Sequence, residues 1–539
     1  MIRLIIVLFT CQFVLGQQQD VPKLVVGIVV DQMRAEYLYR FQDNYGEDGF
    51  KRLLREGFNV KNMHYNYVPT ATGPGHASIY TGTTPANHGI VANNWYDRKM
   101  GREVYCTEDW DVFLVEGNRE DNNLTLSAHS RSPKNLMTTT VTDQLKLFTN
   151  SRSKVVGISL KDRGAILPAG HMADYAFWLN IMTGDFVTSS YYSESLPDWL
   201  IEFNKRKVAD SLLGCEWNFL RAKSDYINSG PDNNGFEKIF EGRNSSMFPY
   251  QLRRLKKNNG NYGLIAETPF GNTLLTELAM ATILGEKMGK GSDTGFLALS
   301  FSSTDYIGHA FGIRSKELED TYIRLDQEIA KLLGFLDVNI GKDNYLIFLT
   351  ADHAGSDNPV FLNRSRLPGK FFDTKVIRDT LESKLSQQFG KKDYIAYCDY
   401  TQIYMHESFK DDMNILKAVG KVLVAMEGIK EIYVPSFDAS RHLEIDSFFR
   451  KSYNRDNSGD ILLHFKSGWM LARNFGASHS TAYNDDTHVP MLWFGHGIPK
   501  GKSVKHHTID QIAPTLSMLL DIPLPNASVR TPILEVFEK

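Results

Sequence analysis

Four apolar segments of strand length each lead into a polar cluster, and this pattern limits the possible folds more than any other feature of the chain. The segments cover residues 23–30, 154–160, 294–301 and 345–349. In the same order, they run toward Asp31, Lys161, Asp305 and Asp352. Near-continuous apolar runs are typical of parallel strands that are covered on both faces. Because ligands bind outside the carboxyl ends of such strands, the polar ends predict one shared site.

Helix-like periodicity between these runs indicates an α/β fold. Apolar residues in 318–336 recur at steps of four and three after Ser315, which is typical of an amphipathic helix with a serine N-cap. A fifth apolar run covers 491–495. The alternation of strands and helices predicts a three-layer α/β sandwich with a largely parallel central sheet.

The chain of 539 residues is long enough for one large core and an inserted subdomain. Residues 370–459 change to short strands, at 394–397 and 401–404, and one helical stretch, at 414–426. We interpret this region as an inserted α+β subdomain. The predicted catalytic core then comprises residues 17–369, with an irregular rim region at 97–153, and residues 460–539.

Residues 1–16 are predicted to be a secretory signal peptide. Arg3 precedes an apolar run, and Val14-Leu15-Gly16 fits a small-residue cleavage site. A membrane anchor is the alternative, but it needs roughly 20 apolar residues, and this run is shorter and broken. We therefore expect a periplasmic or secreted protein that is not bound to a membrane after cleavage.

The overall charge excludes a basic nucleic-acid-binding surface of the usual kind. Lysine and arginine total 60 against 63 acidic residues, for a net charge of −3. We expect small-molecule partners, no nucleic acid, and a monomer. Cys106, Cys215 and Cys398 remain after signal removal, so at most one disulfide forms within the chain, and none lies in a Cys-x-x-Cys metal spacing.

Six oxygen and nitrogen donors are candidate metal ligands. Asp305 and His309 are four residues apart, so a helical turn places both on one face. The other candidates are Asp31, the adjacent pair Asp352 and His353, and His488. Carboxylates and imidazoles without sulfur suit zinc, although manganese or cobalt fits the same donors. Six ligands divide into two groups of three, each with an open position.

Any one of these donors has a simpler interpretation as a solvated loop residue. Other histidines near the motifs are expected to have structural or solvent roles, namely His64, His76, His88, His171, His479 and His496. Among them, His479 is the one most able to take the place of His488. Two metal ions about 4 Å apart activate an attacking oxygen and stabilise a leaving oxygen in phosphoryl transfer.

The segment at residues 69–82 contains the candidate nucleophile, Thr72. The threonine is followed by Gly73, Pro74 and Gly75, and a small-residue helical pattern begins near His76. The first N–H groups of a helix have no partner and attract an anion. A threonine hydroxyl needs a metal ion or a base to become nucleophilic, and a plain turn is the alternative interpretation of this stretch.

These motifs together resemble the alkaline phosphatase superfamily, in its nucleotide pyrophosphatase/phosphodiesterase-like branch. The resemblance rests on residues 69–82, 84–90 and 93–97, on the order of the candidate ligands, and on the closing segment 508–516. It covers about residues 22–360 and 460 to the end. Within the superfamily, the chain is most similar to the PafA-type, phosphate-irrepressible bacterial alkaline phosphatases.

The resemblance implies a specific role for each site residue. It assigns Asp305, His309 and His488 to one zinc ion, and it assigns Asp31, Asp352, His353 and the Thr72 oxygen to a second. It also implies that Asn93, Lys161 and Arg163 hold the non-bridging phosphoryl oxygens. The expected activity is hydrolysis of phosphate monoesters through a phosphothreonine at Thr72, with two Zn²⁺ ions per chain.

Two alternatives remain open at this point. A phosphodiesterase or nucleotide pyrophosphatase would use the same metal site, but the Lys-x-Arg feature at residues 161–163 suits the extra negative oxygen of a monoester. Gly73 stands where the diesterase branch usually has an apolar residue. A non-catalytic protein that binds metal or phosphate would keep the ligands, but the intact Thr72 speaks against it.

Overall fold

The computed structural model describes residues 21–117, 130–437, 444–471 and 475–538. The predicted signal peptide at 1–16 lies outside these residues. No helix among the described residues is long and apolar enough to cross a membrane. Cys106, Cys215 and Cys398 are all free thiols.

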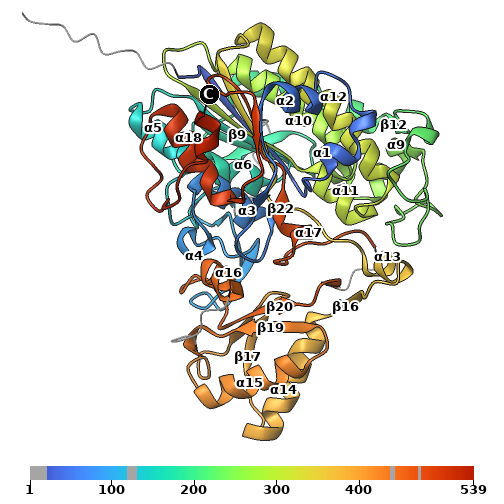
Figure 1. The fold of residues 1–539 in the computed structure, drawn as a ribbon, viewed down its shortest axis with the longest axis vertical. Helices are drawn as coiled ribbons and strands as arrows, with labels where there is room; N and C mark the ends of the chain where they lie inside the picture. The colour runs from blue at the N-terminus through green and yellow to red at the C-terminus, as the bar shows by residue number, and fades with distance from the viewer. Residues whose placement is uncertain (1–20, 118–129, 438–443, 472–474, 539) are drawn as a thin grey trace, which may run out of the picture.

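A ten-stranded sheet forms the centre of the larger part of the molecule (Figure 1). Its order is β24 (Gly501–Ser503), β2 (Phe58–Val60), β23 (Leu492–Gly495), β15 (Tyr345–Thr350), β1 (Leu24–Val30), β14 (Gly295–Phe301), β9 (Val155–Ser159), β10 (Tyr175–Leu179), β11 (Phe186–Ser189) and β7 (Leu114–Val115). The four predicted buried strands are confirmed as the adjacent set β15, β1, β14 and β9, and all four run parallel.

The register of these strands brings their polar ends to one edge of the sheet. Val30 at the end of β1 pairs with Phe301, and Val29 pairs with Thr350. Residues that follow each strand therefore leave the sheet side by side. The fifth predicted run is β23, which lies antiparallel to β15, so the sheet is largely but not wholly parallel.

Helices cover both faces of the sheet, which confirms the predicted three-layer sandwich (Figure 1). One side carries α10 (Phe270–Gly285), α11 (Ser303–Phe311) and α12 (Lys316–Asn339), which pack on one another. The other side carries α3 (Thr72–Thr81), α5 (Val141–Phe148), α6 (Asp162–Ala169) and α18 (Ile512–Leu520). The predicted N-cap of α12 is confirmed, because Ser315 Oγ accepts a hydrogen bond from the Leu318 N–H at 3.1 Å.

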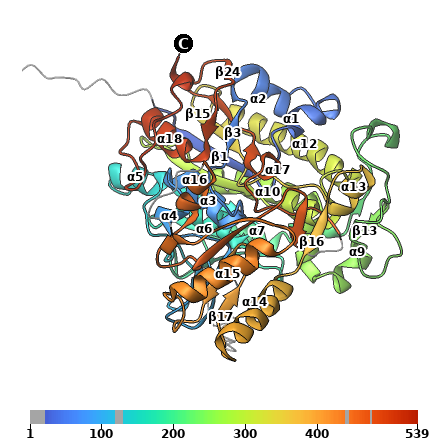
Figure 2. The ribbon, with the colours of Figure 1, turned by 60° about the horizontal axis from the view of Figure 1, so that its bottom comes forward.

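A smaller α+β unit with its own apolar cluster lies below the main sheet in Figure 1. Its four strands are β17 (Ile395–Cys398), β18 (Gln402–Met405), β20 (Ile461–Phe465) and β19 (Ile429–Tyr433), in that order across the sheet. Helices α14 (Thr374–Phe389) and α15 (Met413–Ala425) cover the side of this sheet that faces away from the core, as Figure 2 also shows. We call this unit the subdomain.

The predicted boundary of the subdomain at residue 459 is too early. Strand β20 begins at Ile461 and pairs with both β18 and β19. Beyond it, β21 (Trp469–Leu471) pairs with β16 (Lys370–Phe372) at the other end of the insertion. The returning chain therefore completes the subdomain before it re-enters the core, and a change in composition does not mark that point.

Candidate active site

Helix α3 begins at Thr72 itself, four residues before the predicted start near His76. Ala71, in an extended conformation, is the N-cap, and every residue of the helix is buried. The helix end faces the carboxyl edge of the sheet, so close that a Cβ on Gly75 would lie 2.1 Å from the Asp352 carbonyl oxygen. The absence of a side chain at Gly75 lets the start of α3, which carries the candidate nucleophile Thr72, pack directly against the ends of the strands. Thr72 is only 1% exposed.

Asn93 fixes the first turn of α3. Its Oδ1 accepts a hydrogen bond of 2.7 Å from the backbone N–H of Gly73. This N–H is one of the helix-start donors without an intrahelical partner. Asn93 therefore lies beside the start of α3, next to Thr72.

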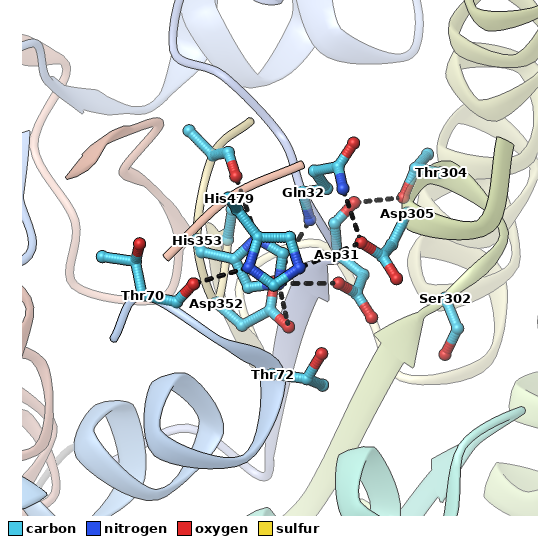
Figure 3. Close-up of polar contacts among 12 residues, drawn as sticks. Asp31, Gln32, Thr70, Thr72, Ser302, Thr304, Asp305, Asp352, His353 and His479 are labelled. Atoms are coloured by element: carbon cyan, nitrogen blue, oxygen red, sulfur yellow. Dashed lines mark hydrogen bonds and ion pairs between the residues drawn. The ribbon is translucent and has the colours of Figure 1, made fainter. Parts of the chain in front are cut away.

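Three buried carboxylates gather above the start of α3 (Figure 3). Asp31 follows β1, Asp305 lies in the first turn of α11, and Asp352 follows β15. Gln32, which sequence reasoning missed, links two of them: its backbone N–H donates to Asp352 Oδ1 at 3.2 Å, and its Nε2 donates to Asp305 Oδ1 at 2.6 Å. Its position directly after Asp31 was the only sequence signal that pointed to it.

Lys161 joins the carboxylates from the end of β9. Its Nζ donates to Asp31 Oδ2 and to Asp305 Oδ2, each at 2.6 Å. Although burial opposes its charge, the two carboxylates raise the pKa of Lys161 above its ordinary value. The lysine is therefore a fixed positive charge at the centre of the site.

Three histidine rings are oriented in the same way by backbone carbonyl groups. The Nδ1 atom of each donates to a carbonyl oxygen: His353 to Ala354 at 2.9 Å, His309 to Ala477 at 2.8 Å, and His479 to Thr70 at 2.7 Å. A carbonyl only accepts hydrogen bonds, so Nδ1 carries the proton and Nε2 presents its lone pair. A hydrogen bond of this kind, from the ring nitrogen that does not bind the metal, orients metal-ligating histidines.

The Nε2 atoms of these rings face the carboxylates. His353 Nε2 lies 3.4 Å from Asp31 Oδ1, and His309 Nε2 lies 3.1 Å from Asp305 Oδ1. His479 Nε2 lies 3.9 Å from the same Asp305 atom. The His353 and His479 rings stack with centroids 3.7 Å apart.

The prediction that His488 joins this cluster is wrong. His488 lies in β22 (His488–Val489), which pairs with β3 (Met63–His64), and this pairing directs the ring away from the site. Its Nε2 contacts the Lys61 carbonyl oxygen at 2.9 Å, and its ring stacks on His64. His479 takes the expected place beside Asp305 and His309.

The donors form two overlapping groups, each spaced to hold a metal ion. Ligand atoms of Asp305, His309 and His479 lie within 4.8 Å of one another, and so do those of Asp31, Asp305 and His353. Asp31 Oδ1, Asp352 Oδ2 and His353 Nε2 are buried and have no hydrogen-bond partner among the described residues. Three buried carboxylates face one lysine here, and uncompensated buried charge is costly.

The local electrostatics agree with this excess of negative charge. Burial and the neighbouring carboxylates raise the pKa of Asp31 to about 7, and burial raises the pKa of Asp352 to about 6. Burial acts to raise the pKa of Asp305, but Lys161, which donates to its Oδ2, holds that pKa below the usual range. A cation between these groups would favour the ionised form of all three.

Arg163 brings a second positive charge to Thr72. It lies in the first turn of α6, and its Nη2 is 3.5 Å from Thr72 Oγ1. Its Nη1 donates at 2.9 Å to the hydroxyl of Tyr105, which donates in turn to Asp162 Oδ1 at 2.6 Å. Arg131 Nε donates to the other oxygen of Asp162 at 2.7 Å.

The predicted rim region thus supplies part of this network. Tyr105 ends β5 (Arg102–Tyr105), and Arg131 lies in β8 (Ser130–Arg131). Sequence reasoning assigned no role to Tyr105, because nothing in the local pattern indicates that a tyrosine in a short hairpin reaches the end of a distant strand.

A cavity of about 650 Å³ opens over this site. At the core end it is lined by Thr72, Asn93, Lys161, Arg163 and Asp305. At the other end it is lined by residues of the subdomain, including Tyr397, Thr401 and Phe465. The site therefore lies between the sheet and the subdomain.

Comparison with known proteins identifies related sequences over almost the whole chain. The family model for type I phosphodiesterase / nucleotide pyrophosphatase matches residues 25–490. A protein named calcium-transporting ATPase from Myroides odoratus is 42% identical, over 98% of this chain and 97% of its own length. The alkaline phosphatase PafA of Elizabethkingia meningoseptica is 43% identical, over 96% of this chain and 94% of its own.

Comparison with solved structures also identifies alkaline phosphatase PafA as similar to this chain. The crystal structure of wild-type alkaline phosphatase PafA superposes with a TM-score of 0.90 at 41% identity, and the match covers 96% of this chain and 99% of that one. A variant of PafA with one threonine, one asparagine, one lysine and one arginine replaced matches equally well. By its sequence, over residues 25–490, and by its fold, the chain belongs to the type I phosphodiesterase / nucleotide pyrophosphatase family.

Proposed function

We propose that this protein is an alkaline phosphatase, a metal-dependent hydrolase of phosphate monoesters with Thr72 as the nucleophile. The observation that carries the proposal is the position of the Thr72 hydroxyl. It lies at the start of α3, 3.5 Å from Arg163 Nη2 and beside the cluster of carboxylates and histidines (Figure 3). The name of one relative, the alkaline phosphatase PafA, which is 43% identical to this chain, supports the same activity.

In the proposed reaction, the Thr72 hydroxyl releases its proton to water, Thr72 Oγ1 attacks phosphorus, and the bond to the ester oxygen breaks. The leaving oxygen takes up a proton from water, and a second water then hydrolyses the phosphothreonine to release inorganic phosphate. Two divalent cations, which we propose to be zinc, would supply the positive charge that stabilises the attacking and the leaving oxygens.

The groups of the chain have separate proposed roles in this reaction. Asp305, His309 and His479 would hold one ion, and Asp31, Asp352 and His353 the other. Arg163, Lys161 and the Asn93 amide would hold the non-bridging oxygens, since a guanidinium fork and an ammonium both stabilise a dianion. The PafA variant has one threonine, one asparagine, one lysine and one arginine replaced, the residue types of Thr72, Asn93, Lys161 and Arg163, which supports this assignment.

Replacement of Thr72 tests the proposal. We expect Thr72→Ala to lower kcat/KM for phenyl phosphate by at least about 10³-fold, on the scale of losses when a catalytic group is removed, while zinc content measured by mass spectrometry stays unchanged. Substantial activity in this variant would rule out the nucleophile. Because one relative is named an ATPase, ATP belongs in the substrate panel.

Phosphodiester hydrolysis at the same site is the second candidate, because the matching family model describes phosphodiesterases. A diester lacks the additional negative oxygen that Lys161 and Arg163 would stabilise. Lys161→Ala should therefore lower kcat/KM for phenyl phosphate much more than for bis-phenyl phosphate. An equal loss on both substrates would favour the diesterase.

We also propose export of the protein to the periplasm or medium, through the segment at residues 1–16, and action as a monomer on small-molecule esters. Mass spectrometry of the exported protein tests the first point, since its N-terminus should be Gln17. Light scattering tests the second.

A further inference from the structure

The cavity over Thr72 is larger than a phosphoryl group requires. Its volume of about 650 Å³ lies in the range of pockets that enclose whole small-molecule ligands, roughly 300–1,000 Å³. Lys161, Arg163 and Asp305 line the core end, and the subdomain contributes one carboxylate to the lining, Asp399. The remaining space extends to the subdomain, where the group attached to the phosphoryl oxygen would lie.

The subdomain end of the cavity has an aromatic wall. Phe372 in β16, Phe465 in β20, and Trp469 and Met470 in β21 all line it. The Phe372 and Phe465 rings stack with centroids 3.7 Å apart and an interplanar angle of 9°. Ring faces and a thioether favour contact with another aromatic ring.

Two buried polar atoms on residues of the same cavity lack partners among the described residues. These atoms are Thr401 Oγ1 and His464 Nε2. Thr401 is only 5% exposed, and His464 is only 4% exposed. His464 Nδ1 lies 3.0 Å from Glu431 Oε1, so Nδ1 donates to the carboxylate. Since burial lowers the pKa of His464, the ring is neutral and Nε2 is an acceptor.

Unsatisfied buried polar atoms are costly, and a ligand that pairs with them removes this cost. An acceptor nitrogen and a hydroxyl in the same cavity as the aromatic wall suit a planar ring that carries a hydrogen-bond donor. An alkyl group offers neither the ring face nor the donor.

We propose that the subdomain forms a leaving-group site, consisting of Phe372, Thr401, His464, Phe465, Trp469 and Met470, that selects phosphate esters of aromatic alcohols with a hydrogen-bond donor on the ring. This inference rests on the proposed phosphatase activity. The core end of the cavity holds the phosphoryl group, while the subdomain end holds the ring of the leaving group. The insertion thereby determines the substrate class of the enzyme.

Phosphonates test the proposal, because they keep the charged end of a monoester and are not hydrolysed. Inhibition constants are measured for methylphosphonate, phenylphosphonate and 4-aminophenylphosphonate against phenyl phosphate hydrolysis by the zinc-loaded enzyme. We expect phenylphosphonate to bind about tenfold more tightly than methylphosphonate, from ring stacking and apolar burial. The amino compound should bind more tightly still.

Substitutions in the leaving-group site test which residues cause the preference for phenylphosphonate. Phe372→Leu and Trp469→Ala should reduce the preference for phenylphosphonate and leave the inhibition constant of methylphosphonate unchanged. Thr401→Val should remove part of the gain from the amino group. Phe389→Leu is the matched control, because Phe389 packs on the apolar cluster of the subdomain and does not line the cavity. This control should change neither ratio.

The possible outcomes separate the two proposals. Equal binding of methyl- and phenylphosphonate, or a preference that both Phe372→Leu and Trp469→Ala preserve, would overturn the leaving-group site while phosphatase activity stands. Lack of any gain from the amino group would overturn the hydrogen-bonding part. If no monoester is hydrolysed and no phosphonate binds, the proposed function itself fails.

Discussion

Tyr105→Phe removes a single hydroxyl that connects Arg163 to Asp162, and we expect this change to lower phosphatase activity. The hydroxyl accepts from Arg163 Nη1 at 2.9 Å and donates to Asp162 Oδ1 at 2.6 Å. The phenylalanine ring keeps the packing of the tyrosine ring. The guanidinium therefore loses the contact that directs Nη2 toward Thr72, and the fold is expected to remain intact.

The expected size of the effect follows from the charge on Arg163. Hydrogen bonds to charged groups contribute about 1.5–3 kcal/mol, so kcat/KM for phenyl phosphate should fall roughly 10- to 150-fold. The loss cannot exceed that of Arg163→Ala, because Tyr105 acts through the arginine. Bis-phenyl phosphate, which has one negative oxygen fewer, should be affected less.

A double-mutant cycle measures whether Tyr105 acts through Arg163. The kcat/KM values of Tyr105→Phe, Arg163→Ala and the double variant are compared with both substrates, and Tyr191→Phe is the control because its hydroxyl contacts the remote His171 carbonyl. We expect Tyr105→Phe to have little further effect once Arg163 is replaced. Additive losses, or an equal loss on monoester and diester, would refute the reasoning.

Other substitutions test the metal site, the packing of α3 and the pH dependence of stability. His479→Ala should lower zinc content and activity strongly, whereas His488→Ala should leave both near the wild-type values, and the reverse result would restore the original assignment. Gly75→Ala should destabilise the fold by about 1–3 kcal/mol in urea unfolding and reduce activity, because its Cβ would lie 2.1 Å from the Asp352 carbonyl oxygen; normal stability would contradict this. His88 is fully buried, and burial lowers its pKa to about 3. Since its unfolded value is about 6.5, its neutral form stabilises the protein above pH 6.5, and this stability is lost as pH falls toward 3. Between pH 7 and pH 5, wild-type should lose about 2 kcal/mol that His88→Gln retains, as measured by urea unfolding at each pH; parallel curves for the two proteins would rule out His88.

The sequence alone determined the central strands and the long helix. Hydrophobic periodicity is a local property, and the apolar runs that end at Asp31, Lys161, Asp305 and Asp352 appear as the four adjacent parallel strands. Helix α12 follows its predicted serine cap for the same reason. Because parallel strands end at one edge, most of the site donors were also predictable.

Only the tertiary structure decided which late histidine reaches the site. His479 and His488 lie nine residues apart, and both follow polar loop residues. Pairing of β22 with β3 directs His488 away, while Gly476 packs against α11, where a Cβ would lie 1.8 Å from the His309 carbonyl oxygen. This close contact directs the loop, and with it His479, back to Asp305.

The roles of Gln32 and Tyr105 and the end of the subdomain were undetermined for the same physical reason. Each depends on contacts between segments far apart in the chain: Gln32 with Asp305, Tyr105 with Arg163, and β20 with β18. Local sequence sets the propensity to form a strand or helix, whereas the partner of a side chain depends on how the whole chain packs. The sequence therefore determined which donors were available, and the tertiary structure decided which of them meet.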